Sequence, residues 1–408
     1  MMAAASAAEN GASVLLLEKM EKAGRKIRIT GKGRCNITNT KSWEEFSTHI
    51  HPKSNFLKHA FFSFSNKDTV DFFEKIGLKC IVERGDRVFP ESGIAGDVVS
   101  KLVNHLLSQG VEIRYDSKVI EINTEDERVR YVKYEHSGVI YIEETEAAIV
   151  TTGGLSYPAT GSDGDGYRFA EHLGLKVTEC FPSLTAIKPD IDYSGLKWLL
   201  LKNVEISLYV SGECVQSEMG ELEFTDNGIE GSIGFKISRR AVIAMKRDER
   251  VYIEIDMKPA VSIEVISARL AKDFESDRSL RKVLRHYLPE QMIDTFISCL
   301  PKKILSSSLF DSKAISEISG LMKGWKMHIV GYTSYERSVI TAGGVSLDEL
   351  IPKRMSSRKY ENLFFAGEVI DLDGDTGGYN LQIAFSTGFM AGREAAYLIK
   401  KSKRLLSE

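Results

Sequence analysis

The spacing of apolar residues changes several times along the chain, and each change predicts a different kind of element. Residues 1–10 are rich in alanine and end at a glycine, which is typical of a helix and its C-terminal cap. Residues 13–18 form a continuous apolar run that closes on an acid, as expected of a parallel strand buried on both faces. Residues 66–76 and 94–109 have apolar side chains at helical spacing, so both are predicted helices.

Between residues 111 and 150 the period becomes two. This alternation predicts short strands, namely 111–114, 118–122, 129–134, 139–143 and 147–150. The last of them runs into the glycine pair Gly153-Gly154. A crossover helix, a β-meander and a strand ending on two glycines are suggestive of the FAD-binding architecture of disulfide-reductase-like flavoproteins, an analogy at the level of fold.

The pattern changes character near Pro182. Residues 184–260 alternate again and predict a separate β-rich domain, whereas residues 261–330 show no strand alternation. Helical spacing at 264–274 and 315–323 predicts a small helical domain over residues 261–334. Residues 335–342 return to a strand pattern that ends on a second glycine pair, Gly343-Gly344.

The resulting expectation is an α/β fold with a discontinuous Rossmann-like domain. Residues 1–183 and 335–408 would form this FAD- or NAD(P)-binding domain, interrupted by a β-barrel-like lobe and a helical lobe.

Composition narrows the class of protein. A chain of 408 residues with 43% hydrophobic and 27% charged residues is an ordinary globular protein with room for several cores. A net charge of −3 argues against a nucleic-acid-binding surface over the whole molecule, and no apolar run is long enough for a membrane span. Five dispersed cysteines suggest reduced thiols, with neither a disulfide framework nor a metal site. These features predict a cytoplasmic enzyme that acts on a small molecule.

Residues 24–39 form the strongest local signal. Glycines that permit unusual backbone angles, Gly24, Gly31 and Gly33, alternate with basic residues, and this segment is too glycine-rich and basic for a regular element. Exposed main-chain N–H groups and cationic side chains in such a loop can bind a pyrophosphate. A solvated basic surface loop is the alternative. Cys35 lies inside the segment, where a structural role is favoured over a redox thiol because no second cysteine is near.

The C-terminal fifth of the chain contains a second glycine-rich segment. An apolar strand ends at Gly367-Glu368, where an acid can hold the ribityl hydroxyls of a flavin. Gly377-Gly378-Tyr379-Asn380 then starts a helix, whose N–H groups and dipole suit the electron-rich pyrimidine edge of a flavin. An ordinary connection between strand and helix is the alternative, but two glycine clusters make it the poorer interpretation.

Other positions are interpreted by their place in the pattern. Glu18 ends a strand in a βαβ context, where an acid accepts hydrogen bonds from an adenosine ribose. The pairs Gly153-Gly154 and Gly343-Gly344 either let the backbone approach a ligand or make tight turns. Residues 160–166 are expected to cap a helix and not to bind calcium.

Several of these stretches resemble the BaiN/YhiN-like NAD(P)/FAD-dependent oxidoreductases. The resemblance rests on residues 29–39, 160–167, 224–231 and 366–380, of which Gly31-Lys-Gly-Arg-Cys-Asn36 and Thr376-Gly-Gly-Tyr-Asn380 are the most specific. It implies a flavin reduced by a nicotinamide cofactor, and some relatives reduce conjugated 3-oxo steroids such as bile acids. No second dinucleotide fingerprint is visible, so NAD(P)H would dock transiently on the flavin face.

Members of this family begin with a short strand and a glycine-rich turn that lead into the helix corresponding to residues 1–10. The sequence opens inside that helix, and the pyrophosphate-binding turn is therefore not among its residues. A mis-assigned start codon, a truncated gene or upstream residues outside the printed sequence would each give this opening. If the protein itself lacks the turn, we expect weak FAD binding and a poorly covered sheet.

The expected function is hydride transfer from NAD(P)H through FAD to an activated, conjugated double bond or a similar small acceptor. A flavoprotein oxidase of a small amine or ketone, and a non-catalytic flavin-binding or regulatory protein, are the alternatives. No catalytic residue is assigned, although Tyr157 and Tyr379 are candidate proton donors by residue type. The predicted cofactor contacts are Glu18, Lys19, Gly24, Arg25, Lys26, Thr30, Gly31, Gly33, Arg34, Cys35, Asn36, Val119, Gly153, Gly154, Gly367, Glu368, Gly377, Gly378, Tyr379 and Asn380.

Overall fold

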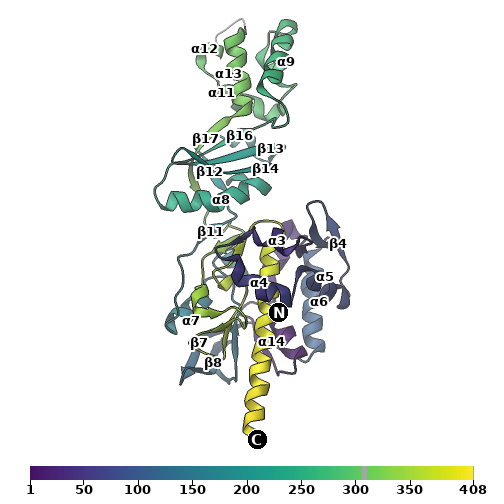
Figure 1. Cartoon of the computed structure of the whole chain (residues 1–408), viewed down its shortest axis with the longest axis vertical. Helices are drawn as coiled ribbons and strands as arrows, with labels where there is room; N and C mark the ends of the chain where they lie inside the picture. The colour runs from purple at the N-terminus through teal and green to yellow at the C-terminus, as the bar shows by residue number, and fades with distance from the viewer. Residues whose placement is uncertain (306–309, 408) are drawn as a thin grey trace. The chain divides into compact units, whose positions relative to one another are not determined.

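The computed structural model describes residues 1–305 and 310–407, and the chain divides into two compact units (Figure 1). The first unit comprises Met1–Phe181 and Val339–Glu408, and the second comprises Pro182–Ser338. The sequence pattern predicted these boundaries after residues 183 and 334.

Two parallel ladders form the centre of the first unit. Strand β1 (Leu15–Leu17) pairs with β6 (Glu112–Arg114), and β10 (Ala148–Val150) pairs with β21 (Leu363–Phe365). Strand β1 was predicted to be buried on both faces, but its three leucines are only half-buried. The reason is that, among the strands the structure describes, β6 is its one partner.

Helices cover these ladders. The small side chains of α1 (Met2–Glu9) let it pack closely on the long helix α14 (Tyr379–Ser407). Helix α6 (Ala95–Ser108) packs against α1 and against α2 (Arg25–Ile29). Figure 1 shows α14 as the longest helix of this unit.

The first unit also contains several small elements. Its other helices are α3 (Trp43–Ser47), α4 (Ser54–Ser63), α5 (Asn66–Lys75) and α7 (Asp165–His172). Its other sheets are β2 (Thr38–Asn39) with β5 (Arg87–Pro90) and β4 (Cys80–Glu83), β7 (Ser117–Glu125) with β8 (Arg128–His136) and β9 (Val139–Glu144), and β22 (Asp373–Gly374) with β3 (Ile50–His51). Strands β19 (Leu350–Ile351) and β20 (Ser356–Ser357) extend the β10–β21 ladder.

The second unit is built on a closed six-stranded barrel, which confirms the predicted barrel-like lobe. In order around the barrel the strands are β12 (Ile187–Pro189), β15 (Gly228–Glu230), β14 (Glu213–Thr225), β13 (Leu199–Val210), β16 (Val251–Asp256) and β17 (Trp325–Tyr332). Helix α8 (Gly231–Lys246) packs on β13 and β14. The remaining helices are α9 (Ile263–Ser276), α10 (Leu280–Leu284), α11 (Ile293–Ser298), α12 (Lys302–Leu305) and α13 (Ser312–Lys323).

Several element predictions were wrong in part, including the β-rich assignment of residues 184–260, which contain helix α8. Residues 325–332 were assigned no strand, yet β17 closes the barrel with Trp325, Met327 and Ile329 buried between exposed neighbours. The strand predicted over residues 335–342 covers only β18 (Ile340–Ala342). Strand β11 (Phe181–Ser183) spans the first boundary between the units.

A further departure concerns residues 24–36, which were expected to form no regular element. Gly24, at φ +71°, starts helix α2, and a 3-10 turn follows over Thr30–Gly33. Half-buried Ile27 packs on the apolar cluster around α6, and this contact explains why a basic, glycine-flanked segment is helical.

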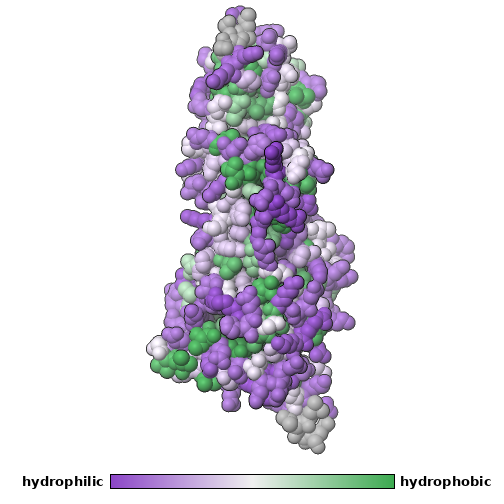
Figure 2. Space-filling view, turned by 90° about the vertical axis from the view of Figure 1, so that its left-hand side faces the viewer, coloured by the Kyte–Doolittle hydropathy of each residue, from purple (hydrophilic) through white to green (hydrophobic). Residues whose placement is uncertain are grey.

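The surface drawn in Figure 2 is mostly hydrophilic, with apolar residues in separate patches. Of the helices in the described part of the chain, none is both long enough and apolar enough to cross a membrane.

Candidate functional site

The carboxyl ends of β1, β10 and β21 meet through two ion pairs. Lys19, which follows β1, bonds to Asp163 and Asp165 beyond β10, both at 2.6 Å. Lys26, in α2, lies 2.5 Å from the carboxylate of Glu368 beyond β21. In open α/β sheets, ligands bind outside the carboxyl ends of the strands. The structure therefore brings several of the predicted site residues together at this edge.

Glu368 is the central acid of this edge. Its Oε2 pairs with Lys26, and its Oε1 accepts the main-chain N–H of Thr341 at 2.9 Å. The side chain is 11% exposed, so a polar ligand can still reach it. Glu368 lies next to Gly153, because a Cβ added there would stand 3.9 Å from the carboxylate.

The glycine pairs are explained mainly by close packing. A Cβ at Gly153 would meet the Ser162 hydroxyl at 2.7 Å, and one at Gly154 would meet Thr341 at 2.6 Å. At Gly344 the obstacle is the carbonyl oxygen of Val369 at 2.7 Å. These distances add a third reason for glycine at these positions, which is close packing of the protein on itself; approach to a ligand and tight turns both stay predictions.

The basic side chains of residues 24–39 point in different directions. Arg25, the first residue of α2, pairs with Glu21 in the bend before the helix at 2.7 Å. Arg34 pairs with Glu83 and lies over the ring of Phe89. Lys26 is the predicted contact of this segment that the structure brings to Glu368.

Cys35 is fully buried, and burial raises the pKa of its thiol to about 11. A thiol with such a pKa is not a thiolate at neutral pH, so the redox interpretation is not supported. Its main-chain N–H donates to Thr30, which closes the 3-10 turn over Gly31 and Gly33.

The two glycine-rich segments are joined directly. Asn36 accepts the N–H of Gly378 at 2.9 Å and donates to the carbonyl of Thr38. Asn39 donates to the carbonyl of Gly377 at 3.0 Å. Asn380 donates to Gly374 at 2.7 Å and accepts from its N–H, which fixes the turn before α14.

Sequence reasoning missed a second group of residues at this turn. His49 Nδ1 lies 2.7 Å from Asp375 Oδ2, and His51 Nε2 lies 3.4 Å from Asp375 Oδ1. The ring of Tyr379 packs on His49 with 4.7 Å between centroids. The alternation His49-Ile50-His51 was a signal in the sequence, because alternate residues of a strand share a face.

Burial alone raises the pKa of Asp375, but the hydrogen bonds from His49 and His51 outweigh this effect and lower the pKa to about 2. Asp375 is therefore a carboxylate at neutral pH. Tyr379 is 3% exposed, and burial followed by the nearby charge of Asp375 raises its pKa, which makes it a poor proton donor.

The remaining predicted contacts are dispersed. Glu18 directly follows β1, its carboxylate accepts the N–H of Met20 at 3.0 Å, and burial raises the pKa of that carboxylate. Val119 is half-buried in β7 opposite Tyr134. Gly367 follows β21 in a 3-10 turn, and its N–H donates to Thr387 at 3.0 Å.

These residues fit an FAD by several observations. Glu18 follows β1, where an acid is expected to bind an adenosine ribose, and Lys26 of α2 pairs with Glu368 beyond β21. The buried hydroxyl of Thr152, just beyond β10, has no hydrogen-bond partner among the described residues. A buried polar atom without a partner at this edge suits a ligand that supplies one.

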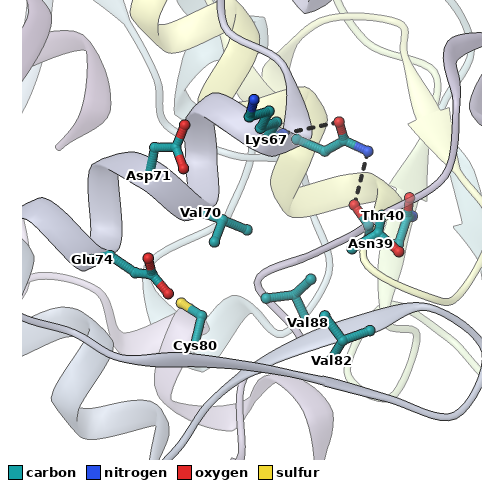
Figure 3. A pocket seen from close by; sticks show the side chains of 10 residues that line it. Asn39, Thr40, Lys67, Val70, Asp71, Glu74, Cys80, Val82 and Val88 are labelled. Carbon is teal, nitrogen blue, oxygen red and sulfur yellow. Dashed lines mark hydrogen bonds between the residues drawn. The ribbon is translucent and has the colours of Figure 1, made fainter.

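A separate cavity of about 340 Å³ lies between α5 and the β4–β5 hairpin (Figure 3). Val70, Val82 and Val88 line it together with Asp71 and Glu74, whose carboxylate approaches Cys80. Burial and the charge of Glu74 raise the pKa of Cys80 to about 11. Asn39 also lines this cavity, so it is shared with the glycine turn.

A Rossmann-type domain with an inserted barrel and this strand-end site defines a flavoprotein oxidoreductase. The chain belongs to the family described as HI0933-like protein Rossmann domain, whose model matches residues 1–394.

Relatives align along nearly the whole chain. The chain is 27% identical over 408 residues to a 3-dehydro-bile acid delta(4,6)-reductase of Clostridium scindens, covering 96% of this chain and 95% of that protein. It is 26% identical over 396 residues to the ribosomal RNA dihydrouridine synthase of Escherichia coli, covering 97% and 94%.

Solved structures agree on the fold. A 3-ketosteroid delta1-dehydrogenase from Sterolibacterium denitrificans matches with a TM-score of 0.54 at 13% identity, covering 97% of each chain. A quinol-fumarate reductase matches with a TM-score of 0.51 at 14% identity, covering 98% of this chain and 69% of that one. At these identities the likeness concerns the architecture alone.

Proposed function

We propose that the protein is an FAD-dependent reductase that uses NAD(P)H to reduce a carbon–carbon double bond activated by a neighbouring carbonyl. The observation that carries the proposal is the Lys26–Glu368 ion pair, which joins the two predicted walls of the cofactor site across 342 residues. FAD, when bound, would supply the hydride-transfer chemistry.

The proposed acceptor is supported by the names of two relatives. In a 3-dehydro-bile acid delta(4,6)-reductase, the name denotes reduction of double bonds in conjugation with a 3-oxo group. In a dihydrouridine synthase, the reduced bond is C5–C6 of uracil, which is conjugated to the C4 carbonyl. Both substrates are therefore electron-poor alkenes, and this shared chemistry is what we carry to the present chain.

The residues of the chain would bind and orient the cofactor. Glu18 would accept hydrogen bonds from ribose hydroxyls, and Lys26 would neutralise phosphate charge. Glu368 would hold ribityl hydroxyls, while the N-terminus of α14 beyond Gly377-Gly378 would face negative charge on the flavin ring. Lys26 would then exchange its bond to Glu368 for a bond to the ligand.

The acceptor is proposed to be a small molecule with a conjugated ketone. Uridine within an RNA is the second candidate, favoured by the two dihydrouridine synthases at 26% and 27% identity. A flavoprotein oxidase and a non-catalytic flavin-binding protein are two further candidate functions. A cytoplasmic location belongs to the same proposal, because five free thiols suit a reducing compartment.

The test begins with the purified chain incubated with FAD. We expect absorbance near 450 nm that remains after gel filtration, bleaching by NADH or NADPH without air, and reoxidation by a conjugated 3-oxo steroid. Reoxidation by a uridine-containing RNA instead would assign the second acceptor. Fast reoxidation by air alone would support the oxidase, and a colourless protein that takes up no flavin would contradict the proposal.

A further inference from the structure

Reduction of a conjugated double bond requires a proton as well as a hydride. When hydride adds to the carbon distant from the carbonyl, the electron pair of the double bond moves towards the carbonyl oxygen and forms an enolate. A proton must then be delivered to the carbon next to the carbonyl. A side chain near the cofactor is the efficient source, because general acid catalysis contributes roughly 10²–10⁴-fold to such steps.

We propose that His49 is this proton donor and that Asp375 is the residue that positions it. The inference rests on the reductase function proposed above. His49 leads into β3 and Asp375 follows β22, and the two strands pair with each other directly before the glycine turn of α14. The main-chain N–H of Asp375 also donates to the carbonyl of His49 at 3.0 Å. The imidazole and the glycine turn are therefore one structural unit.

The ring of His49 has a fixed orientation. Nδ1 faces Asp375 at 2.7 Å, and the flat side of the ring packs on Tyr379 at a 32° tilt. Tyr379 in turn packs on Phe46, with 4.9 Å between ring centroids. No atom of the described residues bonds to Nε2 of His49, whose side chain is 24% exposed. This nitrogen is available to a substrate, whereas Nδ1 is held by the carboxylate.

Three other polar side chains of the candidate site are less suited to donate the proton. The hydroxyl of Tyr379 belongs to a side chain that is 3% exposed. Lys26, which pairs with Glu368, is assigned above to the phosphate charge of the cofactor. His51 reaches Asp375 only at 3.4 Å and is placed one residue beyond Ile50, further along the strand.

The transfer is balanced as follows. The Nε2–H bond of the His49 imidazolium breaks, its electron pair stays on nitrogen, and the proton forms a C–H bond with the enolate carbon. FAD, once reduced by NAD(P)H, would supply the hydride, which carries both electrons of the reduction. The carboxylate of Asp375 stabilises the imidazolium before the transfer and fixes the tautomer with hydrogen on Nδ1 after it. Water returns a proton to Nε2 for the next cycle.

Other charged groups lie near Tyr379, the ring that packs on His49. Glu45 of α3 and Asp86 of the β4–β5 turn act on Tyr379, and Lys41 pairs with both of them. Any pH dependence of the reoxidation rate that is assigned to His49 must therefore be separated from the effects of Glu45, Asp86 and Lys41. Asp375→Asn does so, because it removes the charge that contacts the imidazole and leaves Glu45, Asp86 and Lys41 in place.

The first test uses the flavin-free protein. At a pH above about 8, where histidine is neutral, ¹⁵N NMR should show His49 with hydrogen on Nδ1. Asp375→Asn should weaken that preference. A neutral His49 with hydrogen on Nε2 would overturn the proposal, because the carboxylate would then not position the ring.

The second test separates the half-reactions by stopped flow. In His49→Gln, bleaching of the flavin by NAD(P)H should stay within about twofold of the unaltered protein, whereas reoxidation by the conjugated ketone should slow about 100-fold or more. The matched control His59→Gln, at an exposed histidine of α4 outside the site, should change neither rate by more than about threefold. Equal reoxidation rates in His49→Gln and the unaltered protein would overturn the proton transfer while leaving the proposed function intact. An unaltered protein that no alkene reoxidises would overturn the proposed function, and this inference with it.

Discussion

Gly378 and Gly33 have similar backbone angles, with φ of +88° and +85°, but different surroundings. A Cβ at Gly378 would overlap the carbonyl group of Thr38, whereas a Cβ at Gly33 would meet no atom within 4 Å. Both residues therefore require a left-handed backbone, and Gly378 alone also requires the missing side chain. At the residue scale, this contact holds the glycine turn on β2.

Gly378→Ala should destabilise the fold by about 3 kcal/mol or more, because backbone strain and a collision with the main chain add together. Gly33→Ala is the matched control and should cost about 1 kcal/mol, from backbone strain alone. Urea unfolding of both variants gives the comparison. Equal losses of stability would show that the collision is relieved by a shift of the turn.

Asp375 makes a separate prediction about acid stability. Its pKa is lowered from 3.8 to about 2 in the fold, so the unfolded chain binds its proton first as the pH falls. The stabilisation is fully present above pH about 4 and is lost between about 4 and 2; it amounts to about 2 kcal/mol. In Asp375→Asn the free energy of unfolding should therefore depend less on pH within that window. An unchanged slope would contradict the His49–Asp375–His51 arrangement.

At the residue scale, the sequence indicated which types of residue form the site better than it indicated which side chains contact each other. Glycines and cations marked residues 24–39, yet Arg25 and Arg34 bond to neighbouring acids and Lys26 reaches Glu368. His49 and Asp375 lie 326 residues apart, and spacing along the chain carries no information about such a contact.

At the scale of elements, the Lys26–Glu368 ion pair connects α2 to the turn that follows β21. Glu368→Gln keeps an oxygen for the Thr341 N–H but removes the charge opposite Lys26. We expect a loss of about 2 kcal/mol in stability and about tenfold weaker FAD binding, measured by flavin fluorescence titration.

The control for this change is Glu21→Gln, which breaks the exposed Arg25–Glu21 pair on the same stretch. Exposed pairs of this kind contribute little, so neither stability nor FAD binding should change measurably. If Glu21→Gln and Glu368→Gln behaved alike, the position of Glu368 at the strand end would have no special importance.

Elements with a strong local pattern were predicted correctly. Helix α5 has a capping box between Ser65 and Asp68, and β7 to β9 alternate regularly. Strand β17 and helix α8 were missed because their patterns are short or interrupted by glycine, and the barrel supplies the packing that decides them. Tertiary contacts of this kind are not encoded in a local window.

At the scale of the whole molecule, the second unit leaves and rejoins the chain at neighbouring points. Ile187 of β12 pairs with Tyr332 of β17, and the hydroxyls of Thr185 and Thr333 lie 2.6 Å apart. A short Gly/Ser linker can therefore replace residues 186–332 without pulling the first unit apart.

We expect this deletion variant to fold and to bind FAD about as tightly as the full chain, since the predicted cofactor contacts all lie in the first unit. Flavin absorbance after gel filtration and thermal unfolding would measure both properties. A variant that folds but binds no flavin would show that the second unit contributes to the cofactor site.

Thr38 and Gln382 share a buried hydrogen bond of 2.7 Å between residues 344 positions apart. During synthesis at roughly 5–20 residues per second, the segment around Thr38 leaves the ribosome roughly 17 to 70 seconds before its partner. For that interval Thr38 lacks its partner Gln382 in α14, and Asn36 and Asn39 lack Gly378 and Gly377 of the glycine turn. A chain whose translation terminates early contains residues 24–39 but lacks residues 367–380. The proposed cofactor site therefore requires completed translation.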